Sequence, residues 1–240
     1  AGHAFLERAK RILAEVDDTA KELRDNPTLG RKIVVGAIPT LAPYLLSQLI
    51  DRCRTQLPHL EIHTQEGFRT NLVEGVIAGD LDLALLSLPV ADHRLSIEPL
   101  FTEPLLLVVS KSHRLAGQKI VTAEDLATEN FVLLGDSSTL TAQIQRFCGD
   151  HDFEPRIVHR CAQIATVKAL VGLGVGISIL PQVTRSHEDR RTLVYRALSG
   201  RAPLREIAVV RHLQRYQSRG AEQFLAVLRA ESSVSRDLPI

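Results

Sequence analysis

Two threonines occupy positions where a protein can hold the oxygen atoms of a ligand. Thr40 follows an apolar run over 33–37, and Thr70 follows an alternating run over 60–66. In a parallel sheet the carboxyl end of a strand opens onto a crevice, and the helix that follows directs free backbone N–H groups towards it. Taken alone, each threonine fits the N-cap of its helix. Because the two lie on adjacent turns, together they moderately favour a binding site for an anion or a carbonyl group.

The cysteines form neither a metal motif nor a disulfide motif. Cys53, Cys148 and Cys161 are an odd set, and no two of them make a CxxC pair. A zinc site needs closely spaced ligands, and a disulfide scaffold needs an even set of cysteines. We therefore expect three packing thiols, no metal and a reducing compartment.

Two patterns that resemble cofactor or catalytic motifs are incomplete. The glycines in GLGVG at 172–176 precede an expected strand, whereas a dinucleotide-binding loop follows a strand and opens a helix. They predict a tight turn from helix to strand instead. The segment SHED at 186–189 lacks the second histidine of a zinc-protease motif. Since no GxSxG elbow and no P-loop occur either, the residues predict no enzyme and no cofactor.

Two pairs of titratable residues favour solvated positions over a chemical role. His59 and His63 share one face of an expected strand, but no third metal ligand follows nearby, which favours solvated histidines. Asp80 and Asp82 stand where a strand begins, which favours a solvated turn over paired catalytic carboxylates.

Composition and charge restrict the class of protein. The chain has 240 residues, of which 45% are hydrophobic and 24% charged, and its net charge is +1. These values are typical of a globular protein and give no sign that these residues themselves bind nucleic acid. No apolar run is long enough to span a bilayer, and no signal peptide opens the chain, so we expect a cytoplasmic protein without membrane contact. The absence of methionine predicts a fragment of a longer protein, cut at its N-terminal side.

A helix is predicted over 3–25, where neither proline nor glycine occurs. Its apolar residues recur every three or four positions, at Phe5, Ala9, Ile12, Val16, Ala20 and Leu23. So narrow a stripe is typical of a coiled-coil seam and predicts a partner helix. The alternative is a helix that lies on its own domain. Asn26-Pro27 is expected to end it.

The rest of the chain alternates between two types of segment. Strands are expected at 31–37, 60–66, 81–87, 104–110, 130–134, 157–160, 176–180, 193–197 and 206–211. Helices are expected at 44–56, 71–78, 123–126, 141–148, 164–173 and 216–230. Strands that alternate with helices across short turns predict an α/β fold, with parallel sheets covered by helices.

The order of these segments resembles the C-terminal part of LysR-type transcriptional regulators, from the first residue to about Arg229. AGHAFLERAKRILAEV resembles the family's linker helix, and KIVVGAIPTLAPYLLSQLI resembles its first strand and helix. PHLEI at 58–62 matches the pattern "fP.v.l", and GVIAGDLDLALLS, with Gly79 and Asp82, matches "l..G.lDlai". LVGLGVGISILP, ending at Pro181, matches "v..G.Gia.lP".

The resemblance implies a fold and domain bounds. The fold is two Rossmann-like lobes of the type 2 periplasmic-binding-protein kind, with two chain crossovers, preceded by a long N-terminal linker helix. The linker and dimerisation helix would cover 1–28, regulatory lobe I 29–102 and 206–231, lobe II 103–205, and a tail 232–240.

Within the family, the chain is similar in its amino-acid sequence to the peroxide-sensing OxyR-like group, for example in IQRFC, which ends at Cys148. That group uses a reactive cysteine nine residues before a second, resolving one. Cys148 aligns with the resolving cysteine, but Thr139 stands in the reactive position and Ala142 stands where the group has aspartate. A threonine hydroxyl forms neither a sulfenic acid nor a disulfide. The cysteine pair of the group's peroxide switch is therefore absent from this sequence, unless Cys148 or Cys161 has taken over the role of the reactive cysteine.

The resemblance also implies a ligand pocket between the two lobes. Its positions here are Pro39 and Thr40 on the first turn, Arg69 and Thr70 on the second, Ser138 and Thr139 at the start of lobe II, and a far wall that opens at Gln163 and Ile164. Hydroxyl groups and helix N-termini favour a small anion or a carboxylate, with Arg69 as the nearest countercharge.

The function that follows is effector sensing. A small ligand would favour one closure of the lobes, and the linker helix would carry that change to a homodimer or homotetramer. DNA contacts would come from a helix-turn-helix that precedes this chain. Two alternatives stay open: a solute-binding protein of the same fold, and a thiol redox sensor that uses Cys148 and Cys161.

Overall fold

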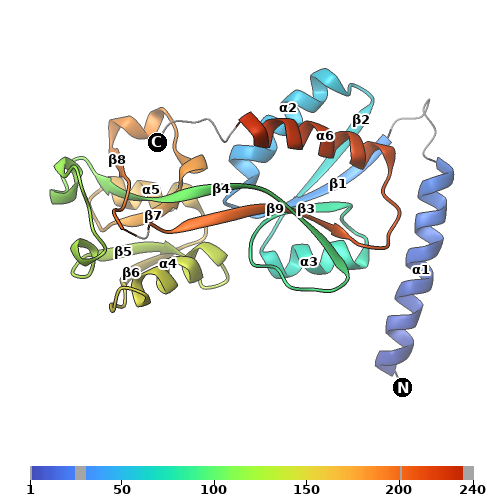
Figure 1. Ribbon diagram of the computed structural model, residues 1–240, viewed down its shortest axis with the longest axis horizontal. Helices are drawn as coiled ribbons and strands as arrows, with labels where there is room; N and C mark the ends of the chain where they lie inside the picture. Colours follow the sequence, from blue (N-terminus) through green and yellow to red (C-terminus); the bar gives the residue numbers. More distant parts are fainter. Residues whose placement is uncertain (1, 25–30, 201, 235–240) are drawn as a thin grey trace. The chain divides into compact units, whose positions relative to one another are not determined.

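The computed structural model describes residues 2–24, 31–200 and 202–234, and the chain divides into two units (Figure 1). Unit 1 comprises residues 1–101 and 207–240, and unit 2 comprises residues 102–206. Each unit has its own apolar core: Leu49 and Phe224 are fully buried in unit 1, and Phe131 and Val167 are fully buried in unit 2. Burial of this kind is the main contribution to the stability of each unit.

The N-terminal segment forms helix α1 (Gly2–Arg24). Its apolar stripe is exposed, with Phe5, Ile12, Val16 and Leu23 between 62% and 81% accessible. Exposed apolar side chains at this spacing fit a partner helix, and the predicted pairing stays a prediction. The expected helix end at Asn26-Pro27 lies outside the described residues. Within the described residues, no helix is both long and apolar enough to cross a membrane.

Three parallel strands form the centre of unit 1: β1 (Arg31–Ala37), β2 (Leu60–Glu66) and β3 (Leu83–Ser87). β1 lies between the other two, and Ala37 at its end is opposite both Glu66 of β2 and Leu85 of β3. The carboxyl ends of the three strands therefore meet at one edge of the sheet, as the alternation of segments predicted.

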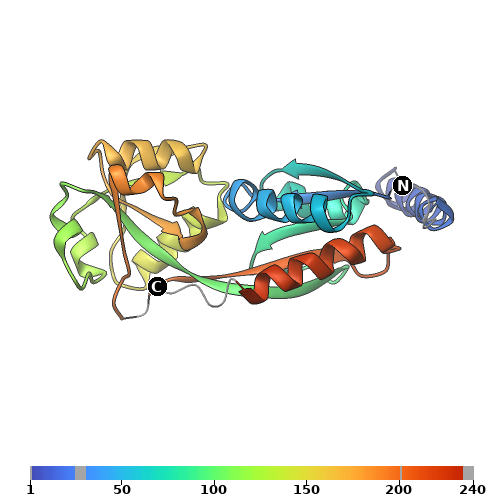
Figure 2. The same ribbon diagram turned by 90° about the horizontal axis from the view of Figure 1, so that it is seen from above.

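Helices cover both faces of these strands. After β1 the chain forms a π-helical turn, η1 (Ala42–Leu46), which continues as α2 (Ser47–Gln56), and α3 (Arg69–Ala78) follows β2. Helix α6 (Arg219–Val234) starts and ends a few residues later than predicted, and residues 235–240 of the expected tail lie outside the described residues. In Figure 1, α2 and α6 lie on one face of the strands and α3 on the other; Figure 2 shows α2 and α6 side by side.

Asp82 connects β1 to the segment that precedes β3. Its Oδ2 accepts a hydrogen bond from the N–H of Val34 at 2.8 Å, and its own N–H donates to the Val34 carbonyl at 2.9 Å. The prediction of a solvated turn is therefore wrong for Asp82. Its carboxylate takes the place of a strand partner, because β3 begins only at Leu83 and the N–H of Val34 needs an acceptor.

Two long strands pass between the units, β4 (Leu95–Ser110) and β9 (Leu204–His212), so that the chain crosses twice, as predicted. They are neighbours in one sheet, in which β9 also pairs antiparallel with β3. In unit 2, β4 pairs antiparallel with β7 (Ser178–Pro181) and β8 (Leu193–Arg196). The sequence predicted only 104–110 of β4, because Pro99 and Pro104 lack the N–H that a regular strand donates.

Unit 2 also contains a parallel pair, β5 (Asn130–Leu134) and β6 (Arg156–Cys161). Helix α4 (Thr139–Gly149) follows β5, and α5 (Ile164–Gly172) follows β6. The short helix expected at 123–126 is a 3₁₀ turn, η3 (Glu124–Leu126). Three more such turns occur at η2 (Arg114–Gly117), η4 (Gln182–Thr184) and η5 (Glu188–Arg191).

Two glycines make the turn from α5 to β7, which confirms the predicted helix-to-strand turn. Gly174 has a φ of 77°, a conformation that side chains rarely adopt. Gly176 is required for a different reason: a Cβ there would lie 2.5 Å from the carbonyl oxygen of Asn130. That carbonyl accepts a hydrogen bond from Ile177 N–H at 2.8 Å, so the two backbones approach closely.

Candidate ligand-binding site

In unit 1 the predicted ligand contacts lie at the carboxyl edge of the parallel strands. Pro39 and Thr40 follow β1, and Arg69 and Thr70 open α3 just after β2. The N–H of Gly67 donates to the Ala37 carbonyl at 3.2 Å, so the two turns leave the sheet as neighbours. The fold thus brings together the two segments that the sequence placed at the ends of separate strands.

Arg69 connects this edge to the turn after the third strand. Its Nη1 donates to the carbonyl oxygen of Pro89 at 2.8 Å, and its side chain is half-buried. Among the described residues no carboxylate pairs with Arg69 within ion-pair distance. Its positive charge is therefore held in place by a neutral partner, which suits the capture of an anion.

Neither threonine is an N-cap, which corrects the simpler interpretation. Helix α3 begins at Arg69 with Phe68 as its N-cap, so Thr70 lies in the first turn with an exposed side chain. The turn after β1 has Leu41 as its N-cap, and Thr40 is buried with 3% of its surface accessible. The sequence placed the start of the helix after β1 too late because Pro43 is accommodated in the first turn of η1, where a missing N–H costs nothing.

In unit 2 the predicted contacts lie at the start of two neighbouring helices. Ser138 is the N-cap of α4 and Thr139 its first residue; Gln163 is the N-cap of α5 and Ile164 its first residue. β5 and β6 are parallel, and Gly135 N–H donates to the Cys161 carbonyl at 2.9 Å, so the two helix starts leave the same edge.

These helix starts keep their positive ends uncapped by side chains. Neither the Ser138 nor the Gln163 side chain accepts a hydrogen bond from its helix. Backbone N–H groups at such ends attract negative charge. The Ile164 side chain is 4% exposed and belongs to the core, so any contact from this residue would come from its backbone N–H.

The cysteines are buried and unsuited to redox chemistry. Cys53, Cys148 and Cys161 are free thiols with 1%, 0% and 7% exposure. Burial raises the pKa of Cys148 to about 12 and also raises the pKa of Cys53 and Cys161. Because the thiolate is the form that reacts with peroxide, these surroundings oppose oxidation. In the described ranges, no group of three or more His, Cys, Asp or Glu side chains could hold a metal ion.

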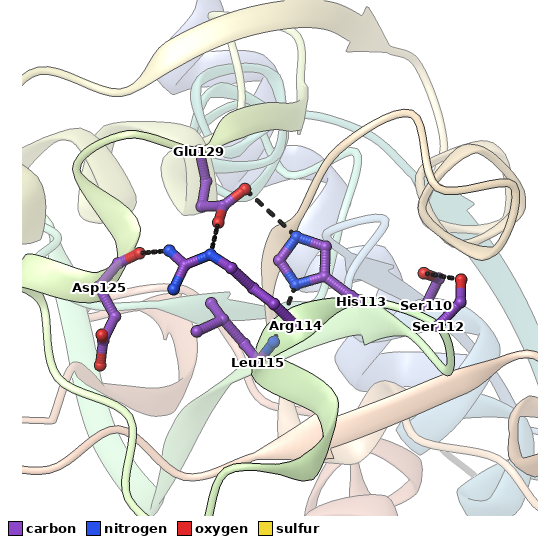
Figure 3. Close-up of polar contacts among 7 residues, drawn as sticks. All are labelled: Ser110, Ser112, His113, Arg114, Leu115, Asp125 and Glu129. Carbon is purple, nitrogen blue, oxygen red and sulfur yellow. Dashed lines mark hydrogen bonds and ion pairs between the residues drawn. The ribbon is translucent and has the colours of Figure 1, made fainter.

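One cluster in unit 2 resembles a catalytic arrangement that sequence reasoning did not find (Figure 3). Glu129 accepts from Arg114 Nε at 2.8 Å and lies 3.2 Å from His113 Nε2. The other ring nitrogen, Nδ1, accepts from the N–H of Leu115 at 3.3 Å. Both ring nitrogens are thus engaged, and the hydroxyl of Ser110 is 3.3 Å from that of Ser112. The arrangement caps η2 and leaves no imidazole nitrogen to activate a nucleophile.

The local sequence could not have revealed this cluster. His113 and Glu129 are 16 residues apart in the chain, and they meet only because the turns around η2 and η3 pack together. Arg114 joins both turns, because its Nη2 also donates to the Asp125 carbonyl at 2.7 Å.

Comparison with known proteins agrees with this geometry. Residues 28–233 match the family model "LysR substrate binding domain". The chain is 28% identical over 247 aligned positions to the uncharacterized HTH-type transcriptional regulator YcgK of Bacillus subtilis, covering 95% of the chain and 76% of that protein. It is 30% identical to the hydrogen peroxide-inducible genes activator of Pectobacterium carotovorum, covering 88% of the chain and 70% of that protein.

A solved structure shows the same architecture. The putative LysR family transcriptional regulator PA01 of Pseudomonas aeruginosa superimposes with a TM-score of 0.77 at 27% sequence identity, covering 97% of this chain and 82% of that one.

Proposed function

The chain belongs to the LysR substrate-binding domain family, the effector-binding part of LysR-type transcriptional regulators, and from this premise we propose that its effector is a small anion or carboxylate. Pro39, Thr40, Arg69 and Thr70 of unit 1, and Ser138, Thr139, Gln163 and Ile164 of unit 2, are the residues that we propose contact it.

One observation carries this proposal: in each unit, groups that stabilise negative charge follow the carboxyl ends of a pair of parallel strands. In unit 1 these are two threonines and Arg69, whose guanidinium donates to a neutral carbonyl. In unit 2 they are two helix starts without side-chain caps. Such groups bind oxygen atoms, and none of the proposed contact residues is a base that could activate a hydroxyl as a nucleophile, so we infer binding without catalysis.

We propose that effector binding acts on an oligomer. The exposed apolar stripe of α1, with Phe5 75% and Leu23 81% accessible, fits a second copy of the helix. A homodimer or homotetramer would then respond to whichever state the ligand binds more tightly. DNA contacts would come from a helix-turn-helix on the N-terminal side of α1, and the protein would work in the bacterial cytoplasm.

The redox alternative has less support. Peroxide sensing needs an accessible thiolate, whereas Cys148 has no exposed surface and a pKa raised to about 12. The position of the reactive cysteine, at the start of α4, is occupied by Thr139, which has no thiol. The physical surroundings therefore favour a non-covalent effector.

A thermal-shift screen of the chain against small inorganic anions, aliphatic acids and aromatic acids tests the proposal. A ligand at about 100 times its dissociation constant stabilises the folded state by roughly 2.7 kcal/mol, which raises Tm by several degrees. Thr40→Ala and Arg69→Gln are expected to abolish the shift. The matched control is Thr55→Ala, because Thr55 is exposed on α2 and bonds only its own helix, to the Asp51 carbonyl.

Two results would overturn the proposal. A screen without any hit would remove the small anion as effector. A hit that survives both Thr40→Ala and Arg69→Gln would move the effector away from the edge of unit 1.

A further inference from the structure

Unit 2 contains a pocket outside the proposed effector residues, between the connection of η4 with η5 and strand β8. Its volume is about 230 Å³. Three arginines, Arg185, Arg190 and Arg196, line it together with Asp189 and Tyr195. We call it the arginine pocket.

The carboxylate of this pocket is already neutralised within the fold. Asp189 Oδ2 accepts from Lys168 Nζ at 2.7 Å, from the Tyr195 hydroxyl at 2.7 Å and from Ser186 N–H at 2.8 Å. Burial raises the pKa of Asp189, but these hydrogen bonds outweigh it and hold the pKa below its ordinary value. Asp189 is thus an ionised structural anchor whose charge Lys168 balances, and it orients Tyr195 at the pocket wall.

Arg196 has hydrogen bonds but, among the residues that the structure describes, no carboxylate that balances its charge. Its Nη2 donates to the Ala116 carbonyl at 2.5 Å and its Nη1 to the Tyr195 carbonyl at 3.3 Å, while its Nε is buried without a hydrogen-bond partner. Carbonyl oxygens are neutral, so they fix the position of the guanidinium without balancing its charge. A half-buried cation in this state gains from a nearby anion.

The other two arginines add to the same positive field. The guanidinium of Arg185 lies over the Tyr195 ring, 5.7 Å from its centroid, which holds it at the wall. Arg190 is exposed on η5. In the part of the chain that the structure describes, no ion pair joins Arg185, Arg190 or Arg196 to a carboxylate.

We propose that the arginine pocket is a second binding site, which takes a small molecule with two or more negative charges, carried by phosphoryl or carboxylate groups. Three arginines and one neutralised Asp189–Lys168 pair leave a surplus of positive charge in the pocket. The planar guanidinium of arginine can donate two parallel N–H bonds to two oxygen atoms of either a carboxylate or a phosphoryl group. A volume of about 230 Å³ is below that of pockets for drug-sized ligands, which suits a ligand of a few carbon or phosphorus atoms.

Isothermal titration of the chain at low ionic strength tests the site, with citrate and inorganic phosphate as probes and sodium acetate at equal ionic strength as the comparison. One probe molecule is expected to bind in the arginine pocket of each chain, whereas acetate binds there at least tenfold more weakly. Arg190→Gln and Arg196→Gln are expected to weaken binding by about tenfold or more, as for the loss of a charge-assisted hydrogen bond. Arg190 has an exposed side chain, so Arg190→Gln tests the site even if Arg196→Gln disturbs the fold.

Matched variants separate binding in the arginine pocket from general surface charge and from the proposed effector site. Arg191→Gln removes the same charge one position further along η5, from a residue that does not line the pocket, and should change the dissociation constant by less than about twofold. Thr40→Ala and Arg69→Gln should leave the dissociation constant unchanged, because neither residue lines the arginine pocket.

Each outcome decides the proposal. Tighter binding of phosphate supports a phosphoryl ligand, and tighter binding of citrate supports a polycarboxylate. The proposal is overturned if neither probe binds, if Arg190→Gln and Arg196→Gln bind as the parent does, or if Arg191→Gln loses as much affinity. It is also overturned if Thr40→Ala or Arg69→Gln abolishes all binding, because the anions then occupy the effector site only.

Discussion

The two units contain arginine–glutamate pairs with the same chemistry in opposite surroundings. In unit 1, Arg229 of α6 donates to both oxygens of Glu98, at 2.6 and 2.7 Å. In unit 2, Arg205 of β9 contacts Oε1 of Glu103 through Nε at 2.9 Å and Nη2 at 2.8 Å. In the first pair the Arg229 side chain is 45% exposed and the Glu98 side chain 30%. In the second pair the Arg205 side chain is 1% exposed and the Glu103 side chain 7%. Both glutamates belong to β4.

The difference shows that geometry alone does not set the importance of an ion pair. The unit 1 pair has the better two-pronged geometry, but water can replace either partner. The unit 2 pair has no water to replace a lost partner, so its carboxylate must be fully satisfied: Glu103 Oε2 accepts from Val183 N–H at 2.8 Å. A buried pair need not stabilise the fold more than apolar residues would, but it is costly to break.

Breaking the buried pair should produce the largest effect. Glu103→Ala leaves the Arg205 guanidinium buried without a countercharge, and we expect the free energy of unfolding to fall by about 3–5 kcal/mol. Urea-induced unfolding measured by circular dichroism at pH 7 checks this. The double variant Glu103→Leu with Arg205→Met should recover most of the loss, because two apolar side chains need no partner. A loss below about 1 kcal/mol in Glu103→Ala would remove the contrast between the two pairs.

Two glycines of unit 2 show the same contrast between a position enclosed by neighbouring atoms and a position open to solvent. Gly176→Ala places a methyl group 2.5 Å from the Asn130 carbonyl, a backbone atom that cannot move aside alone. We expect a loss of about 1–3 kcal/mol, as for other overpacked sites. Gly149→Ala is the matched control, since nothing lies within 4 Å of its added Cβ. Equal unfolding midpoints in urea for the two variants would contradict the close approach.

The exposed pair should produce the smallest effect. Glu98→Gln is expected to lower the free energy of unfolding by no more than about 1 kcal/mol, because both partners are partly solvated. The loss should shrink in 1 M NaCl, whereas the loss in Glu103→Ala should change little. A salt-independent loss in Glu98→Gln would mean that Glu98 acts through packing.

The pH dependence of this pair follows from Glu98. The hydrogen bond from Arg229 lowers the pKa of Glu98 below its ordinary value of 4.5. A carboxyl with a lowered pKa in the folded state contributes stability above its unfolded pKa and loses it as the pH falls through the folded value. The difference between the parent chain and Glu98→Gln should therefore be full at pH 7 and decline below about pH 4.5, in urea titrations at each pH.

The sequence predicted the features that depend on neighbours along the chain. Alternation of strands and helices placed Thr40 and Thr70 after β1 and β2, and their parallel pairing brought the two turns together. The glycines before β7 were predicted as a turn, though only the structure showed that Gly176 is set by the Asn130 carbonyl. Asp82 was missed as a structural residue, because its acceptor role depends on Val34, 48 residues away.

By itself, then, the sequence determined the α/β class, the apolar stripe of α1 and the residues that end each parallel strand, since periodicity and turn chemistry act over a few residues. Only the tertiary structure decided which charges are balanced. Arg205 meets Glu103 across 102 residues, and Asp189 accepts from Lys168 and Tyr195, which lie on separate elements. Within the described residues, Arg196 donates to carbonyl oxygens and pairs with no carboxylate. The value of a charge depends on its burial and its partners, and folding sets both.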